Sequence, residues 1–446
     1  MLPLYTRFLS TSDYGKLDII QTTISLLIPL ITLQAVEAVF RYSVDMKKKS
    51  NASVVLINGL FLCLLGMVIS LSLYPVFNKV EPFSSYIGLF YLIMFLNMAC
   101  DVMKQFVRGL GKITVFVVSD LSYTASIVLF NVIFLTVIQL GLRGYLLSMV
   151  FAQLVNMAVL LIFGNIVDNL DLRSFDRSFL KSMIIYSAPL IPNGLMWWIM
   201  NVSDRYMLTY FMGFDATGIY SVSYKFPSLI TLVNSIFFMA WQLSAMQEYG
   251  KDGYEGFYKK VFGALSSLLL LATGFVLVIL KPLLKVFVAN SFYESWKYVP
   301  LLLIGTVFQA YSSFFGTNYT ASKKTKGAFS TSVLGAIVNI GINFILIPVC
   351  GIQAAAFSTM AAYIAMWLMR VKDTQKFVRI EVDWGNLTVS LTIIGIQILG
   401  LYVIRNNLAF LAFGSVLIVV LLFVQRKYIK QVYSFGMRLI AEIREK

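Results

Sequence analysis

Long runs without a single charged residue constrain this chain of 446 residues more than any other feature. About 18 or more predominantly apolar residues are enough to cross the hydrocarbon core of a membrane as an α-helix. Closed β-barrels, the other way to cross, give alternating segments of about 10 residues, and these runs do not alternate. The runs therefore predict an all-α polytopic membrane protein, and they occupy residues 54–78, 121–142, 261–280, 299–322, 386–404 and 406–425.

The composition agrees with this fold class. Only 13% of the residues are charged, against roughly 25% in a soluble protein. Adding the less clear-cut apolar segments gives thirteen expected spans, at residues 17–40, 53–77, 85–103, 113–138, 143–165, 182–212, 216–240, 261–280, 299–320, 327–348, 352–369, 386–404 and 406–425.

The net charge of +15 follows the predicted topology and does not indicate a nucleic-acid partner. Connections on one side of the spans hold 26 Lys and Arg residues, those on the other side hold 8, and Arg205 and Lys225 remain inside the spans. Because positively charged loops stay in the cytoplasm, we expect a cytoplasmic C-terminus. An odd number of spans then places the N-terminus outside. The opening "MLPLYTRFLS" is typical of the tail of a first helix, which would bring the full pattern to fourteen spans.

The chain also repeats itself weakly. "RFLSTSDYGKLDIIQTTISLLIPL" resembles "YFMGFDATGIYSVSYKFPSLITL", with Gly15 opposite Gly218, and a later pair of segments places Gly141 opposite Gly351. Either apolar residues match by chance, or the halves are parallel repeats, a transporter architecture with the substrate site between the repeats. On the second interpretation we expect an N-terminal bundle with a truncated first helix in residues 1–170, a second bundle in 171–371, and two additional helices with a basic tail in 372–446.

The sequence lacks the usual signals of an enzyme or a metalloprotein. It has no histidine, and Cys63, Cys100 and Cys350 are too far apart in sequence to give metal-ligand spacing. It has no G-x-x-x-x-G-K-[ST] phosphate loop. The connections are too short to fold as a separate domain, which needs at least about 50 residues. We therefore expect no catalytic residue, no bound metal and no cofactor.

Charged residues within the spans are the candidates for function, because a charge at membrane depth is costly and normally faces a bundle interior or a watery cavity. The motif "NVSDRYM" places Asp204 and Arg205 side by side in a span that also contains Pro189 and Pro192. Adjacent helical residues point about 100° apart, so each needs a different partner. Lys225, expected one turn into the next helix, could pair with Asp204 and leave Arg205 to bind an anion; a static ion network is the alternative.

Two further candidates lie on one early helix, and two amides lie on a late one. Glu37 and Arg41 are four residues apart, a spacing that permits an ion pair with either a structural or a functional role. Asn339 and Asn343 share a helix face at the same spacing, and we interpret them as helix-packing residues.

Three segments resemble the bacterial polysaccharide (O-antigen) flippases of the multidrug/oligosaccharidyl-lipid/polysaccharide exporter superfamily. They are "LPLYTRFLSTSDYG", "NVSDRYMLTYFMGFDATGIYSVSYKF" and "NIGINFILIPVCGIQAAAFSTMAAY", and the similarity extends over nearly the whole chain. The resemblance implies two six-helix bundles around a V-shaped cavity, with two extra helices. It also implies that an undecaprenyl-diphosphate-linked oligosaccharide is moved across the bacterial cytoplasmic membrane by alternating access.

The same resemblance suggests residues for this transport. It implies that Arg7 lies at the outer mouth of the cavity and that Asp204, Arg205 and Lys225 match family positions that hold the anionic head group. The implied partners are the lipid-linked oligosaccharide and membrane lipid, with a polysaccharide polymerase and the chain-length machinery beside them. From the resemblance we expect that most of the first helix, which lines the cavity in the family, is missing from this sequence.

Two other functions compete with this one. A multidrug or cation antiporter of the same superfamily would need an acidic cavity, for which Asp18, Glu37 or Asp120 are candidates. A membrane polymerase or glycosyltransferase would need long outer loops with paired catalytic groups, and the short loops argue against it.

Overall fold

The computed structural model describes residues 1–46, 52–322, 324–378 and 380–444, and this part of the chain contains helices and no strands. It divides into two compact units, Met1–Trp198 and Ile199–Lys446. The division falls inside one helix, α10 (Ile191–Met212). The span-based boundaries expected at 170/171 and 371/372 stay predictions.

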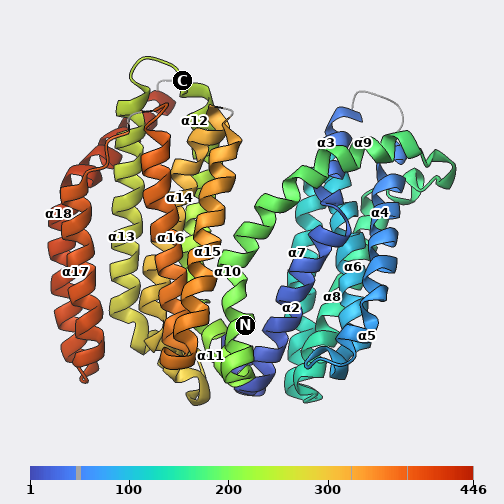
Figure 1. Cartoon of the computed structure of the whole chain (residues 1–446), viewed down its shortest axis with the longest axis horizontal. Coiled ribbons are helices and arrows are strands. Elements are labelled where there is room, and N and C mark those ends of the chain that lie inside the picture. The colour runs from blue at the N-terminus through green and yellow to red at the C-terminus, as the bar shows by residue number, and fades with distance from the viewer. Residues whose placement is uncertain (47–51, 323, 379, 445–446) are drawn as a thin grey trace. The chain divides into compact units, whose positions relative to one another are not determined.

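Unit 1 is a bundle in which α8 packs against α6 and α7, and α3 packs against α6 (Figure 1). Its helices are α1 (Leu2–Phe8), α2 (Thr11–Ile31), α3 (Ala35–Met46), α4 (Ala52–Ser72), α5 (Tyr74–Phe77), α6 (Phe83–Gly109), α7 (Ile113–Asn131), α8 (Gly141–Phe163), α9 (Arg177–Ser187) and the first part of α10.

The first predicted span, 17–40, is broken. Helices α2 and α3 meet at an angle of 58°. Pro29 lies in the last turn of α2, and Leu33 and Gln34 both have positive φ angles, of 51° and 58°. Proline removes a backbone donor and these two residues leave the right-handed helical region, so the helix cannot continue straight.

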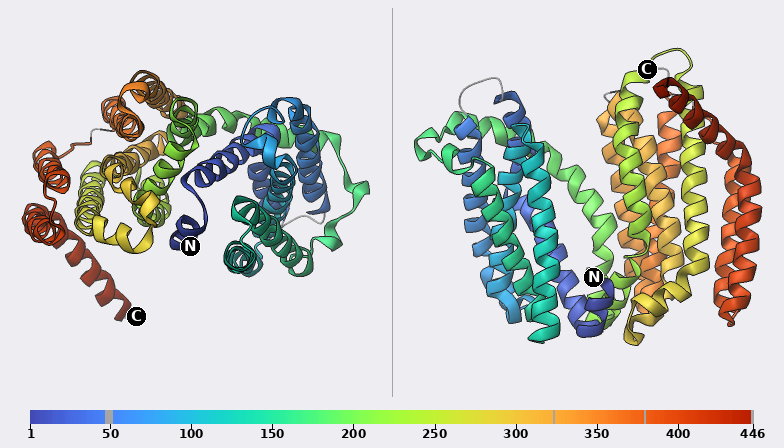
Figure 2. Two further views of the ribbon diagram at one scale, coloured as in Figure 1. Left: turned by 90° about the horizontal axis from the view of Figure 1, so that it is seen from below. Right: turned by 180° about the vertical axis from the view of Figure 1, so that it is seen from behind.

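Unit 2 is built around α16 (Ile352–Thr374), which packs against α14 and α15. The two helices beyond it, α17 and α18, lie along α13 (Figures 1 and 2). The other helices of this unit are α11 (Phe214–Ser223), α12 (Pro227–Glu248), α13 (Tyr254–Phe287), α14 (Val299–Ala321), α15 (Thr325–Cys350), α17 (Trp384–Val403) and α18 (Asn407–Arg444).

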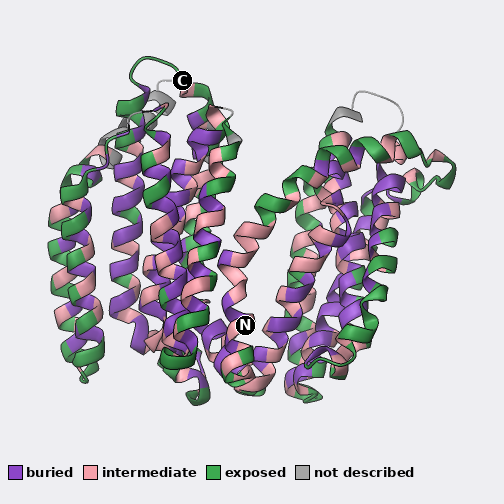
Figure 3. Ribbon diagram, viewed as in Figure 1, coloured by how far each residue is buried: buried purple, intermediate pink, exposed green. Residues whose placement is uncertain are grey.

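The number of candidate membrane spans agrees with the number predicted from the sequence. In the described part of the chain, 12 helices are long and apolar enough to cross a membrane, or 13 when the bent α2–α3 pair counts as one span. Large apolar side chains on α7, α12, α15 and α18 are exposed along much of their length (Figure 3). Extended exposed apolar surface of this kind fits helices that face lipid.

One expected span differs in a way that matters for function. Residues 216–240 do not form one helix, because α11 ends at Ser223 and α12 begins at Pro227. Proline favours the first turn of a helix and disfavours the helical conformation in the residue before it. Lys225 therefore lies in an exposed turn between two helices, and the prediction that it sits one turn into a helix is wrong.

Candidate functional site

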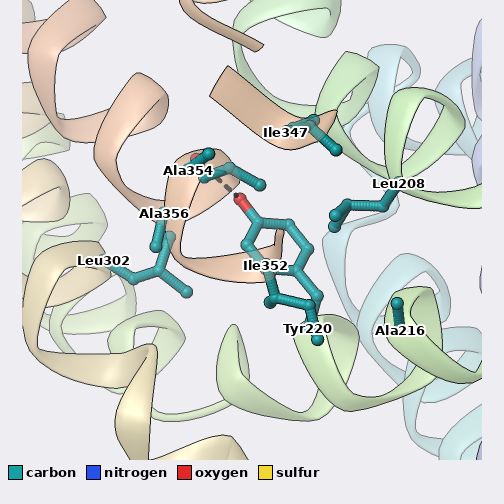
Figure 4. Packing of buried hydrophobic residues seen from close by; sticks show 9 residues of the cluster. Leu208, Ala216, Tyr220, Leu302, Ile347, Ile352, Ala354 and Ala356 are labelled. Carbon is teal, nitrogen blue, oxygen red and sulfur yellow. Dashed lines mark hydrogen bonds between the residues drawn. The ribbon is translucent and has the colours of Figure 1, made fainter. Parts of the chain in front are cut away.

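A cluster of buried polar groups lies where α10, α11, α15 and α16 meet, next to buried apolar side chains. Tyr220 of α11 is fully buried there, among Leu208, Leu302 and Ile347. Figure 4 shows its ring between these residues, with the hydroxyl directed at the first turn of α16. Small residues, including Ala354 and Ala356, form that turn and let the helices approach closely.

Asp204 lies directly beside this ring and is fully buried. Its carboxylate accepts hydrogen bonds from the Tyr220 hydroxyl (2.6 Å), the Asn343 side-chain amide (2.6 Å) and the Thr359 hydroxyl. A buried carboxylate is tolerated only when such donors replace water. Three helices, α11, α15 and α16, thus each contribute one neutral donor to the Asp204 carboxylate on α10.

A second layer of hydrogen bonds fixes these donors. The Ser358 hydroxyl donates to the Asn343 side-chain oxygen (2.6 Å), and the Asn343 amide also donates to Asn339 (3.2 Å). Asn339 in turn accepts from the Ser203 hydroxyl (2.8 Å). Of the two asparagines, predicted as helix-packing residues, Asn343 therefore also holds Asp204 directly, and Asn339 holds Asn343. The shared helix face of the two asparagines was visible in the sequence, but the hydrogen bond from Asn343 to a residue 139 positions away was not.

Arg205 has a different environment, as expected for a residue rotated by about 100° from its neighbour. Its side chain is 8% exposed, and one terminal nitrogen donates to the Asn201 carbonyl oxygen (2.5 Å). The guanidinium lies over the ring of Tyr224, at 4.8 Å from the centroid, and 5.9 Å from that of Tyr220. Tyrosine rings attract a cation at these distances through their electron-rich faces.

Neutral polar groups continue from the arginine into the bundle. The Asn201 side-chain oxygen accepts hydrogen bonds from the Tyr363 hydroxyl (2.8 Å) and from the Gln309 amide (3.1 Å). Gln309 also donates to Tyr363 (2.9 Å). Amides and hydroxyls are the groups with which proteins hydrogen-bond other polar, uncharged molecules.

The remaining predicted residues do not join this cluster. The Asp204–Lys225 pair that the sequence left open does not form, since the hydrogen bonds of Asp204 come from three neutral groups and Lys225 is exposed. Arg7 on α1, and Glu37 and Arg41 on α3, belong to the other compact unit, where their side chains are exposed.

The side chains of the cluster can bind ligands through charge and hydrogen bonds. Among the residues that the structure describes, no group of three or more His, Cys, Asp or Glu could hold a metal ion. One carboxylate surrounded by hydroxyl and amide groups can hold a proton or a small monovalent cation. The guanidinium of Arg205 presents a planar fork that suits a phosphate oxyanion.

Comparison with known proteins gives the family. The family described as polysaccharide biosynthesis protein matches residues 1–242, more than half of the chain, and the MatE family matches residues 189–345. No curated protein sequence matches.

Solved structures of similar fold are transporters and flippases. A lipid II flippase, MurJ, in its inward closed conformation has a TM-score of 0.68 at 14% identity, covering 98% of this chain and 97% of that one. An inward-facing multidrug resistance MATE family transporter of the MOP superfamily has a TM-score of 0.66 at 13% identity, covering 84% and 94%. The chain belongs to the polysaccharide biosynthesis protein family and has the all-helical, multi-pass fold of MOP-superfamily membrane transporters.

Proposed function

We propose that this protein moves an undecaprenyl-diphosphate-linked oligosaccharide, a polysaccharide repeat unit, across the bacterial cytoplasmic membrane by alternating access. It catalyses no covalent reaction and works with its C-terminus in the cytoplasm. Its partners are the lipid-linked substrate, membrane lipid, and a polysaccharide polymerase with its chain-length machinery. The match to the polysaccharide biosynthesis family supports the substrate class.

The observation that carries the proposal is the environment of Arg205. The neighbouring carboxylate of Asp204 receives its hydrogen bonds from neutral groups on three other helices, while the guanidinium lies over two tyrosine rings. A diphosphate offers the oxyanions that this fork binds in pairs. The adjoining Asn201, Gln309 and Tyr363 supply groups that can hydrogen-bond sugar hydroxyls.

Transport by alternating access requires that the substrate bind two conformations with different affinity. Exposed cations elsewhere, at Arg7 and Arg41, are candidates for contacts with the diphosphate at other stages of the cycle, with Glu37 beside Arg41. Lys225, in its exposed turn after α11, is a further candidate.

Reconstitution into liposomes tests the proposal. A defined undecaprenyl-diphosphate oligosaccharide is placed in one leaflet, and an impermeant lectin reports its arrival in the other. We expect arrival only in liposomes that contain the protein, and little transport of the same oligosaccharide on uncharged undecaprenol. Equal arrival in protein-free liposomes, or equal transport of the uncharged lipid, would contradict the proposal.

A second candidate function, cation-coupled multidrug antiport, is favoured by a separate observation. The MatE match covers residues 189–345, which include Asp204 and Asn343, and these residues form a buried acidic site. In the same liposomes an antiporter would expel an organic cation dye when a proton or sodium gradient is imposed. A flippase of lipid-linked saccharide would leave the dye where it is.

A further inference from the structure

A polar cleft lies at one end of unit 2, away from the Asp204 cluster, and shares no residue with it. Its volume is about 770 Å³, within the range of about 300–1,000 Å³ that is typical of small-ligand sites. Two basic and two acidic residues line it, Lys259 and Lys427 against Glu381 and Asp383, and Trp384 forms part of the wall.

The cleft lies at the level where several membrane spans end. Lys259 precedes the uncharged run that begins at residue 261 on α13, and Lys427 follows the run that ends at 425 on α18. Trp384 is the first residue of α17, and α16 ends at Thr374. Tryptophan concentrates at the boundary between membrane and water, where lipid head groups lie. This is also the side that is rich in Lys and Arg, predicted to be cytoplasmic.

One ion pair and one carboxylate held by neutral donors make up the acidic side of the cleft. Lys259 donates to the Glu381 carboxylate at 2.6 Å, and the Asp383 carboxylate accepts from the Tyr428 hydroxyl (2.9 Å) and the Asn386 backbone N–H (3.1 Å). The backbone N–H of Asn386 lowers the pKa of Asp383, and the hydrogen bond from Lys259 lowers the pKa of Glu381. Both carboxylates are therefore ionised at neutral pH, and the cleft offers two positive and two negative charges together.

We infer that this cleft binds the head group of a zwitterionic aminophospholipid, phosphatidylethanolamine, from the cytoplasmic leaflet. The lipid phosphate lies against Lys259 and Lys427, whose ammonium groups each have three donors. The lipid ammonium lies against Glu381 and Asp383. Basic pockets between transmembrane helices commonly receive anionic head groups. Here the two carboxylates repel a purely anionic head group and favour one that also carries a cation. A bound lipid would join α13 to the two additional helices, α17 and α18.

Binding to the purified, delipidated full chain tests this inference, with labelled phosphatidylethanolamine as the probe. We expect saturable binding of one lipid per chain, weaker by about tenfold in the K259Q/K427Q double variant, because charged hydrogen bonds are lost. The matched control is K372Q/K376Q, which removes two exposed lysines from the same end of unit 2, outside the cleft. It should bind as the wild-type protein does.

Further measurements distinguish specific binding of phosphatidylethanolamine from binding of any negatively charged group. E381Q changes a side chain that is 79% exposed, so folding should be kept, and it should remove the preference for phosphatidylethanolamine over phosphatidylglycerol. Inorganic phosphate at the same concentration should not displace the lipid. The inference is overturned if phosphatidylglycerol binds the wild-type protein as tightly, if inorganic phosphate competes equally, or if the control variant loses binding as much as K259Q/K427Q.

Discussion

Asp204 and Arg205 are neighbours in sequence, and apart from Tyr220, which contacts both, their charged groups have different partners. The carboxylate is held by hydrogen bonds from Tyr220, Asn343 and Thr359. The guanidinium donates to the Asn201 backbone carbonyl and lies over the faces of Tyr224 and Tyr220. Placing two opposite charges one residue apart therefore gives two separate sites on one helix, because consecutive side chains point in different directions.

The ring of Tyr224 should contribute to anion binding through the arginine. A cation over an aromatic face is worth about 0.5–2 kcal/mol, so Tyr224→Leu should weaken binding of the undecaprenyl-diphosphate oligosaccharide by roughly 2- to 30-fold. Tyr224→Phe keeps the ring and is the matched control. If the two variants bind the substrate equally well, the ring does not hold the guanidinium for this purpose.

Asp204 should be sensitive even to an isosteric change. In Asp204→Asn, one acceptor oxygen becomes an NH₂ group that faces donors from other helices, which leaves buried groups without partners. We expect the free energy of unfolding to fall by about 1–3 kcal/mol, measured by thermal or denaturant unfolding in detergent. Asp252→Asn, at an exposed position before α13, should change little. Equal stability of the two variants would contradict the role given to the buried carboxylate.

At the scale of helices, α13 is the element on which the two additional helices pack. The Gln397 amide of α17 donates to the Gly274 carbonyl (3.0 Å), and the Lys281 ammonium donates to the Leu401 carbonyl (2.6 Å). Towards the other end of α13, Gly263 lies against the ring of Tyr428 on α18. Contacts at three levels thus hold α17 and α18 along one face of α13.

A methyl group at Gly263 should disrupt this packing. A Cβ there would lie 2.1 Å from a ring carbon of Tyr428, whose hydroxyl is hydrogen-bonded to Asp383 and cannot easily move. Gly263→Ala should therefore destabilise the protein by about 1–3 kcal/mol. Gly256→Ala, in the same helix with no atom within 4 Å, should be neutral or slightly stabilising. The reverse order of unfolding temperatures would show that α18 does not pack on α13 in this way.

Helices that are defined by a long apolar run could be predicted from the sequence. Helix breaks that are defined by only a few residues could not. The run of apolar residues was enough to predict the long span at 261–280. The break at 224–226 is a turn of three residues before Pro227, which is too short to change a hydropathy average. Because of this turn, Lys225 does not lie in the predicted membrane helix. The Asp204–Asn343 hydrogen bond could not be predicted, because one sequence does not reveal which helices are neighbours.

At the scale of the whole molecule, the topology can be tested with the natural cysteines. Cys350 ends α15 and is exposed, on the side predicted to be extracytoplasmic, while Cys63 and Cys100 are buried. An impermeant maleimide should therefore label the wild-type protein in intact cells at Cys350 alone. In the variant C350S/K376C, labelling should appear only after the membrane is disrupted. Labelling of this variant in intact cells would reverse the predicted orientation.

Transport by Arg205→Ala, compared with the wild-type protein in the same liposomes, tests the central claim most directly. With α10 folded and the protein amount equal, loss of the guanidinium should abolish arrival of the undecaprenyl-diphosphate oligosaccharide in the opposite leaflet. Arg205→Lys keeps the charge without the planar fork and should retain partial activity. If Arg205→Ala transports the lipid-linked oligosaccharide at the wild-type rate, the arginine of α10 does not bind the diphosphate and the account is wrong.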